Sequence, residues 1–111
     1  MARPTLPRPL GGYLSDRQLA ELRAMLEEQR EFRVDQLRDP RDPTAPLGGS
    51  DPDITRSLMS AAGEALRDIE DALARMDAGR YGSCVACGGP VEIERLEILP
   101  QVARCMACQR R

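Results

Sequence analysis

The sequence predicts a mainly α-helical protein: an antiparallel two-helix coiled-coil hairpin that ends in a C-terminal four-cysteine zinc finger. Three observations support this fold class. Two Cys-x-x-Cys pairs lie near the C-terminus, separated by seventeen residues. Two long stretches carry apolar residues at helical spacing, and a segment rich in proline and glycine separates them. We therefore expect a leader at 1–12, a hairpin at 13–79 and a zinc finger at 80–111.

The leader is expected to be flexible. Residues 1–12 contain Pro4, Pro7 and Pro9 and end in two glycines, a composition that breaks helices and builds no core of its own. Its basic residues are expected to be solvated.

The first arm of the hairpin is predicted to begin after Ser15 and to run to about Arg38. Ser15 can cap the helix while the side chain of Gln18 reaches back to it. Leucines then recur at spacings of three and four residues. Pro40 disfavours a helical conformation at the residue before it, so the arm ends there.

The tip of the hairpin is predicted to be the segment 39–52, which contains four prolines and the pair Gly48-Gly49. This connection is longer than most helix–helix loops, and such loops are usually functional or disordered. It is also acidic. Asp51, together with Asp53 just beyond the segment, is therefore a candidate partner-binding residue.

The second arm is expected to start near Asp53, whose side chain suits a helix cap, and to stop at Gly79. Its apolar face is a single stripe of Ile54, Leu58, Ala62, Leu66, Ile69, Leu73 and Met76. Gly63 interrupts good helix formers, which suggests that the two backbones come close there.

Folding the chain back near residue 46 brings the two apolar stripes face to face. The predicted pairs are Leu19 with Leu73, Leu26 with Leu66, Val34 with Leu58, and Leu37 near Ile54. This mutual register favours an antiparallel coiled coil, a thin rod with an acidic end.

The four cysteines are predicted to bind one structural zinc ion through Cys84, Cys87, Cys105 and Cys108. The chain has no histidine, so the ligand set is all sulfur, and four thiolates leave no open position for catalysis. Two disulfides or a redox motif are the alternatives, and the redox motif needs a strand–helix setting that the flanking residues do not supply. Between the two pairs, Val91, Ile93, Leu96 and Ile98 are expected to cover the metal, and Tyr81 to pack there with its hydroxyl outward.

Charge and composition exclude several functions. Residues 13–79 hold fifteen acids against nine arginines, so the stem would repel DNA phosphates, and no sequence-specific DNA binding is expected. No apolar run approaches the ~20 residues that span a bilayer. The N-terminus also lacks a basic-then-apolar signal pattern, so a cytoplasmic location is expected, where thiols stay reduced and can bind metal. No base, nucleophile or pocket is visible, so we do not expect an enzyme. We also expect a monomer.

The finger carries a specific set of residues around its cysteines, namely the segments 79–88 and 105–109 and, between them, Val91, Arg95, Leu96 and Pro100. In these residues it resembles the zinc finger of the DksA/TraR family of bacterial transcription regulators. It implies a protein that binds RNA polymerase directly, inserting the coiled-coil tip into the secondary channel, commonly together with the alarmone ppGpp. The finger arginine Arg95 matches a family arginine and is a candidate contact for polymerase or ppGpp. A nucleic-acid-binding zinc ribbon is the alternative function.

The tip departs from the family pattern, in which an aspartate is followed three residues later by alanine. Here Asp53 is followed at that spacing by Arg56, and Asp51 by Ile54. The resemblance then leaves two interpretations. The protein binds RNA polymerase without the usual effect on transcription, or Asp51 and Asp53 act there in a different way.

Overall fold

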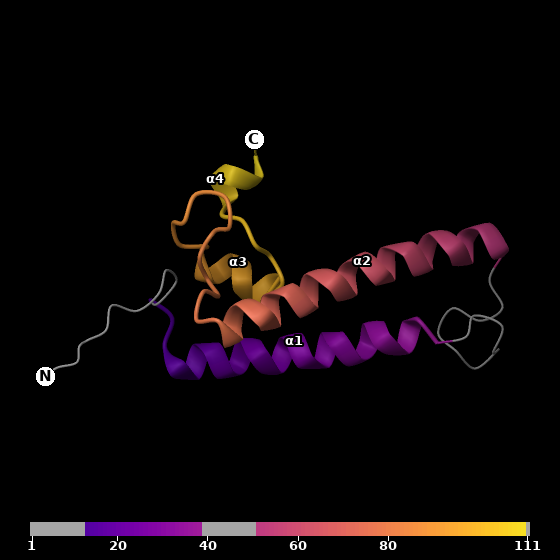
Figure 1. The fold of residues 1–111 in the computed structure, drawn as a ribbon, viewed down its shortest axis with the longest axis horizontal. Coiled ribbons are helices and arrows are strands. Elements are labelled where there is room, and N and C mark those ends of the chain that lie inside the picture. Colours follow the sequence, from indigo (N-terminus) through magenta and orange to yellow (C-terminus); the bar gives the residue numbers. More distant parts are fainter. Residues whose placement is uncertain (1–12, 39–50, 111) are drawn as a thin grey trace, which may run out of the picture.

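The computed structural model describes residues 13–38 and 51–110 and confirms the predicted fold class. Two long helices, α1 (Asp16–Gln36) and α2 (Pro52–Asp77), run antiparallel and pack together, and two short helices, α3 (Ile93–Ile98) and α4 (Met106–Gln109), belong to the finger. Figure 1 shows the finger seated at one end of the hairpin, beside the start of α1 and the end of α2. The molecule is elongated, with principal extents of 59 × 31 × 20 Å. The predicted leader and residues 39–50 of the predicted tip loop lie outside the described residues.

Helix α1 begins as its sequence predicts. The Ser15 hydroxyl accepts a hydrogen bond from the backbone N–H of Gln18, and the Gln18 side chain accepts one from the N–H of Ser15, which completes a capping box. The helix ends at Gln36, with Leu37 as its C-cap, close to the predicted end.

Helix α2 begins earlier than predicted, because Asp51 and not Asp53 is its N-cap. The Asp51 carboxylate accepts hydrogen bonds from the backbone N–H groups of Asp53 and Ile54. Pro52, which was assigned to the loop, is the first helical residue, a position where its missing N–H costs nothing. At the other end Gly79 has φ 74°, so the predicted stop is confirmed.

The hydrophobic core lies at the finger end of the hairpin. There the side chains of Leu22 and Leu26 on α1 and of Ile69 and Ala72 on α2 are almost completely buried. They form one cluster with residues of the finger: Tyr81, Cys84, Val91, Leu96 and Cys105. The hairpin and the finger therefore share a single core, which holds the finger on the rod.

The predicted pairing of apolar residues near the tip is wrong. Val34, Ile54 and Leu58 are 43%, 56% and 43% exposed, and Phe32 is 55% exposed. In Figure 1 the two helices are close at the finger end and separate toward the tip. The apolar stripes continue to the tip, but the helices diverge too far there to bury them.

The register also differs from the prediction. Arg23 bonds Asp77 at 2.7 Å and Arg30 bonds Glu70 at 3.2 Å across the hairpin. Both acidic partners lie about two helical turns closer to the finger than the residues predicted to face these arginines. The contact that Gly63 suggested is absent as well, because a Cβ built there would meet no heavy atom within 4 Å.

No helix within the described ranges is long and apolar enough to cross a membrane.

Candidate metal centre and partner-binding sites

The first Cys-x-x-Cys pair sits in a tight turn whose backbone points at the sulfurs. The N–H of Ala86 lies 3.4 Å from Sγ of Cys84, and the N–H of Gly89 lies 3.4 Å from Sγ of Cys87. The turn needs a left-handed residue, which Gly88 supplies with φ 79°. Donors aimed at the sulfurs stabilise thiolates, the form that binds metal.

The second pair is presented by α4. Cys105 is the N-cap of this short helix and Cys108 lies within it, so both sulfurs project from one helical turn. The backbone N–H of Gln109 donates to the Cys105 carbonyl at 2.9 Å and closes the turn. The two pairs are held against each other because the N–H of Val85 donates to the Ala103 carbonyl at 2.9 Å.

The four sulfurs converge on one point. All four Sγ atoms lie within 4.8 Å of one another, and those of Cys87 and Cys105 are 3.8 Å apart. A tetrahedral zinc site with Zn–S bonds of about 2.3 Å has sulfur–sulfur edges of about 3.8 Å. The separation therefore fits a zinc ion, and all four cysteines are free thiols, as a metal site requires.

The thiols differ in acidity because each has different hydrogen-bond partners. Backbone hydrogen bonds, first from Cys105 and then from Cys87 and Ala86, lower the pKa of Cys84 to about 6 despite its burial. Hydrogen bonds with the other three sulfurs raise the pKa of Cys108 to about 12. Four sulfurs this close hold their last proton tightly, and a divalent cation is the species that makes all four thiolates favourable.

Two tyrosine hydroxyls donate to backbone carbonyls of the finger, one from within the finger and one from the start of the hairpin. The Tyr81 hydroxyl donates to the Pro100 carbonyl at 2.7 Å and the side chain is 3% exposed, so the predicted outward hydroxyl is wrong. Burial raises the pKa of Tyr81 strongly, which the charge of Arg75 opposes. The Tyr13 hydroxyl, just before α1, donates to the Val91 carbonyl.

The apolar residues between the cysteine pairs follow the prediction except at one position. Val91 and Leu96 are fully buried and Ile93 packs against the core. Ile98, at the end of α3, is 75% exposed and covers nothing. The reason is that α3 turns only one face toward the core, and residue 98 lies off that face.

The candidate tip residues Asp51 and Asp53 lie at the far end of α2 from the metal centre. The Asp51 carboxylate caps the helix, as described above. The Asp53 carboxylate pairs with Arg56 at 3.2 Å, and both side chains are largely exposed. The arginine that departs from the family pattern therefore lies against the tip carboxylate and offsets its charge.

The finger arginine Arg95 is tied to the finger itself. Its Nε donates to the Arg104 carbonyl at 3.1 Å, and Nη1 lies 3.8 Å from the sulfur of Met106. The side chain thus links α3 to the chain just before the second cysteine pair, a positioning role that sequence alone did not indicate.

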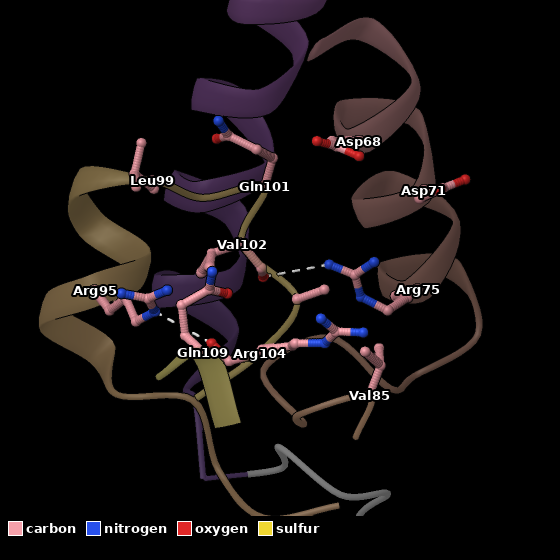
Figure 2. A pocket seen from close by; sticks show the side chains of 11 residues that line it. Asp68, Asp71, Arg75, Val85, Arg95, Leu99, Gln101, Val102, Arg104 and Gln109 are labelled. Atoms are coloured by element: carbon pink, nitrogen blue, oxygen red, sulfur yellow. Dashed lines mark hydrogen bonds between the residues drawn. The ribbon is translucent and has the colours of Figure 1, made fainter. Parts of the chain in front are cut away.

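A cleft that sequence reasoning missed lies between α2 and the finger. Figure 2 shows Arg75 of α2, together with Arg95 and Arg104 of the finger, among its lining residues, with Asp68 and Asp71 above them on α2. Its volume is about 410 Å³. The spacing of four residues between Asp71 and Arg75 would allow an ion pair within α2.

Within the cleft, Arg75 instead reaches the finger. Its Nη2 lies 3.4 Å from the Val102 carbonyl, whereas its buried Nε has no hydrogen-bond partner among the described residues. Burial lowers the pKa of Arg75, and the neighbouring Tyr81 and carboxylates oppose this effect. No sequence pattern links α2 to a residue 27 positions away, so the cleft could not be predicted.

The fold and site together define a helical hairpin that carries a C4-type zinc finger. Residues 79–111 match the prokaryotic DksA/TraR C4-type zinc finger family, so the finger belongs to that family and a structural zinc ion is its cofactor. Both were expected from the sequence.

A solved structure extends the likeness in fold beyond the finger. The structure of transcription factor DksA2 from Pseudomonas aeruginosa matches with a TM-score of 0.64 and 24% identity over 93% of this chain and 88% of that one. This likeness shows that the two chains share a fold. No curated protein sequence matches the chain.

Proposed function

We propose that the protein is a cytoplasmic transcription regulator of the DksA/TraR type, which binds RNA polymerase directly and inserts the tip of its hairpin into the secondary channel. One observation carries the proposal: a rod with the metal centre at its root and carboxylates at its far end. Helix α2 has 26 residues. At ~1.5 Å per residue it spans roughly 39 Å, enough to carry Asp51 and Asp53 deep into a channel.

The same geometry argues that the protein acts without chemistry of its own. The zinc ligands we propose are Cys84, Cys87, Cys105 and Cys108, which leave the metal no open position. The hairpin at 13–79 is the inserting unit, and the finger at 80–111 holds its root, because the two share one core. The protein acts as a monomer in this proposal.

We extend the proposal to ppGpp as a co-effector, which the family resemblance implies. The cleft between α2 and the finger supports it, because Arg75, Arg95 and Arg104 can offer a phosphate several donors there. Asp68 and Asp71 line the same cleft and weaken its positive potential. We therefore expect weaker binding of ppGpp than three arginines alone would give.

The test is in vitro transcription with purified polymerase, with and without the protein and ppGpp. The decisive variant is the double change Asp51→Asn and Asp53→Asn. Asparagine caps a helix about as well as aspartate, so the tip keeps its structure and loses only charge. Glu64→Gln is the matched control, since it removes one exposed charge from the middle of the same helix.

We expect core polymerase to be retained by the immobilised protein without DNA, and the transcript pattern to change with the wild type and the control. The double variant should bind but alter transcription less. An unchanged transcript pattern together with no retention of polymerase would refute the proposal. Salt-sensitive binding of DNA by the protein, without polymerase retention, would instead favour the nucleic-acid-binding zinc ribbon.

A further inference from the structure

The outer face of the finger carries an apolar groove that the metal centre and the tip do not explain. Its floor is formed by Ile98 and Leu99 at the end of α3 and by Met106 of α4, which are 75%, 46% and 40% exposed. Its volume is about 460 Å³. We call this the finger groove. Three large apolar side chains gathered at one exposed hollow make this groove a candidate binding surface.

The walls of the finger groove are charged. Glu92, Glu94 and Arg95 line it. The Glu92 carboxylate accepts a hydrogen bond from the backbone N–H of Met106 at 3.3 Å, and Arg95 is held by the Arg104 carbonyl. Glu94 is exposed. Two carboxylates against one arginine leave the rim net negative, so the groove suits an apolar side chain followed or preceded by a cation.

The described part of the chain begins beside this groove. The Tyr13 hydroxyl donates to the carbonyl of Val91, the residue directly before Glu92. Burial raises the pKa of Tyr13, and the negative charges of Glu92 and Glu94 raise it further, which agrees with their proximity. Tyr13, to which the leader is joined, therefore lies next to the groove wall.

We propose that the leader, residues 1–12, docks in the finger groove, with Leu10 on the apolar floor and Arg8 against Glu94. This inference stands apart from polymerase binding and concerns a contact within the chain. The leader carries Arg3 and Arg8 and no acid, so its charge complements the rim.

The lengths also fit. An extended chain spans at most about 3.6 Å per residue, so the chain length allows Leu10 to reach at most roughly 11 Å from Tyr13 and Arg8 at most roughly 18 Å. Helix α3, with six residues, is about 9 Å long at ~1.5 Å per residue. Gly11 and Gly12 allow the chain to turn from the Tyr13 anchor toward the groove. A docked leader would cover the apolar face of the finger, and any partner that uses this face would have to displace it.

The chain has no tryptophan, so the variant Leu10→Trp places a single reporter in the leader. We expect the tryptophan fluorescence of the folded variant to be blue-shifted relative to that of the same variant unfolded in denaturant, where the indole is exposed to solvent. Adding Ile98→Asp should move the emission to the exposed value, since a carboxylate on the floor excludes the indole. Leu58→Asp on α2, another exposed apolar position far from the groove, is the matched control and should leave the emission unchanged.

A charge exchange tests the second contact. Glu94→Arg should reduce the blue shift, and adding Arg8→Glu should restore it. Circular dichroism and zinc content are measured for every variant, to check that the exposed substitutions leave the fold intact. A solvent-like emission of Leu10→Trp, or a blue shift that Ile98→Asp does not remove, would overturn the proposal. A blue shift that grows with protein concentration would also overturn it, by assigning the groove to a second copy of the chain.

Discussion

The clearest prediction concerns Gly63, a glycine in the middle of α2. Glycine in a helix interior is less favourable than alanine by about 1 kcal/mol. A Cβ built at this position meets no heavy atom within 4 Å, so the alanine methyl clashes with nothing. We therefore expect Gly63→Ala to stabilise the protein by about 0.5–1 kcal/mol. For a domain of this size that corresponds to a rise in Tm of roughly 4–8 °C per kcal/mol.

The assay is thermal unfolding of the zinc-loaded protein, followed by far-UV circular dichroism. Gly79→Ala is the matched control, because this glycine ends the same helix with φ 74°. A side chain in the left-handed region costs roughly 1–2 kcal/mol, so the same substitution should lower Tm there. A lower Tm for Gly63→Ala would refute the reasoning and would mean that the two helices approach each other at this glycine, as the sequence had suggested.

Three further predictions follow from the shared core. Removing zinc with a chelator should abolish cooperative unfolding and reduce helicity, because two of the cysteines belong to the same core as the hairpin leucines. Unchanged helicity and Tm after chelation would contradict this prediction. Leu26→Ala should lower the free energy of unfolding, measured with denaturant, by about 2–5 kcal/mol. Leu58→Ala, where the two helices separate, should lower it by less than about 1 kcal/mol. Equal effects would show that the helices also pack together near Leu58. Tyr81→Phe should cost about 1–3 kcal/mol, since the Pro100 carbonyl loses its donor. The pKa of Tyr81 is raised above its unfolded value of 10.0, so its contribution is present below about pH 10 and lost as pH rises further. Wild-type stability should therefore fall above pH 10 more steeply than that of the phenylalanine variant.

Much of the fold followed from local sequence signals. The capping box at Ser15, the stop at Gly79 and the spacing of the four cysteines are each decided within a few residues, and the structure agrees with all three. The turn at Gly88 is also a local feature, because a left-handed glycine lets the backbone N–H groups point at sulfur.

The sequence-based predictions were wrong where two neighbouring residues could cap the same helix, or where a contact joins distant segments of the chain. Asp51 and Asp53 are both good caps, and the presence of Pro52 at the first helical position decided for Asp51. The outward hydroxyl predicted for Tyr81 was wrong because its acceptor, the Pro100 carbonyl, is nineteen residues away. The exposure of Ile98 depends on how α3 is rotated against the core, which its own sequence does not show.

The sequence by itself determined the two helices, the acidic stem and the four-cysteine cluster, because caps, helical periodicity and cysteine spacing act over short stretches of chain. Only the tertiary structure decided the register of the hairpin, the separation of its helices toward the tip, the cleft between α2 and the finger, and the groove on the finger's outer face. These features depend on how rigid elements dock through a few buried side chains. A docking geometry is the sum of many weak contacts between distant residues, and no single stretch of sequence specifies it.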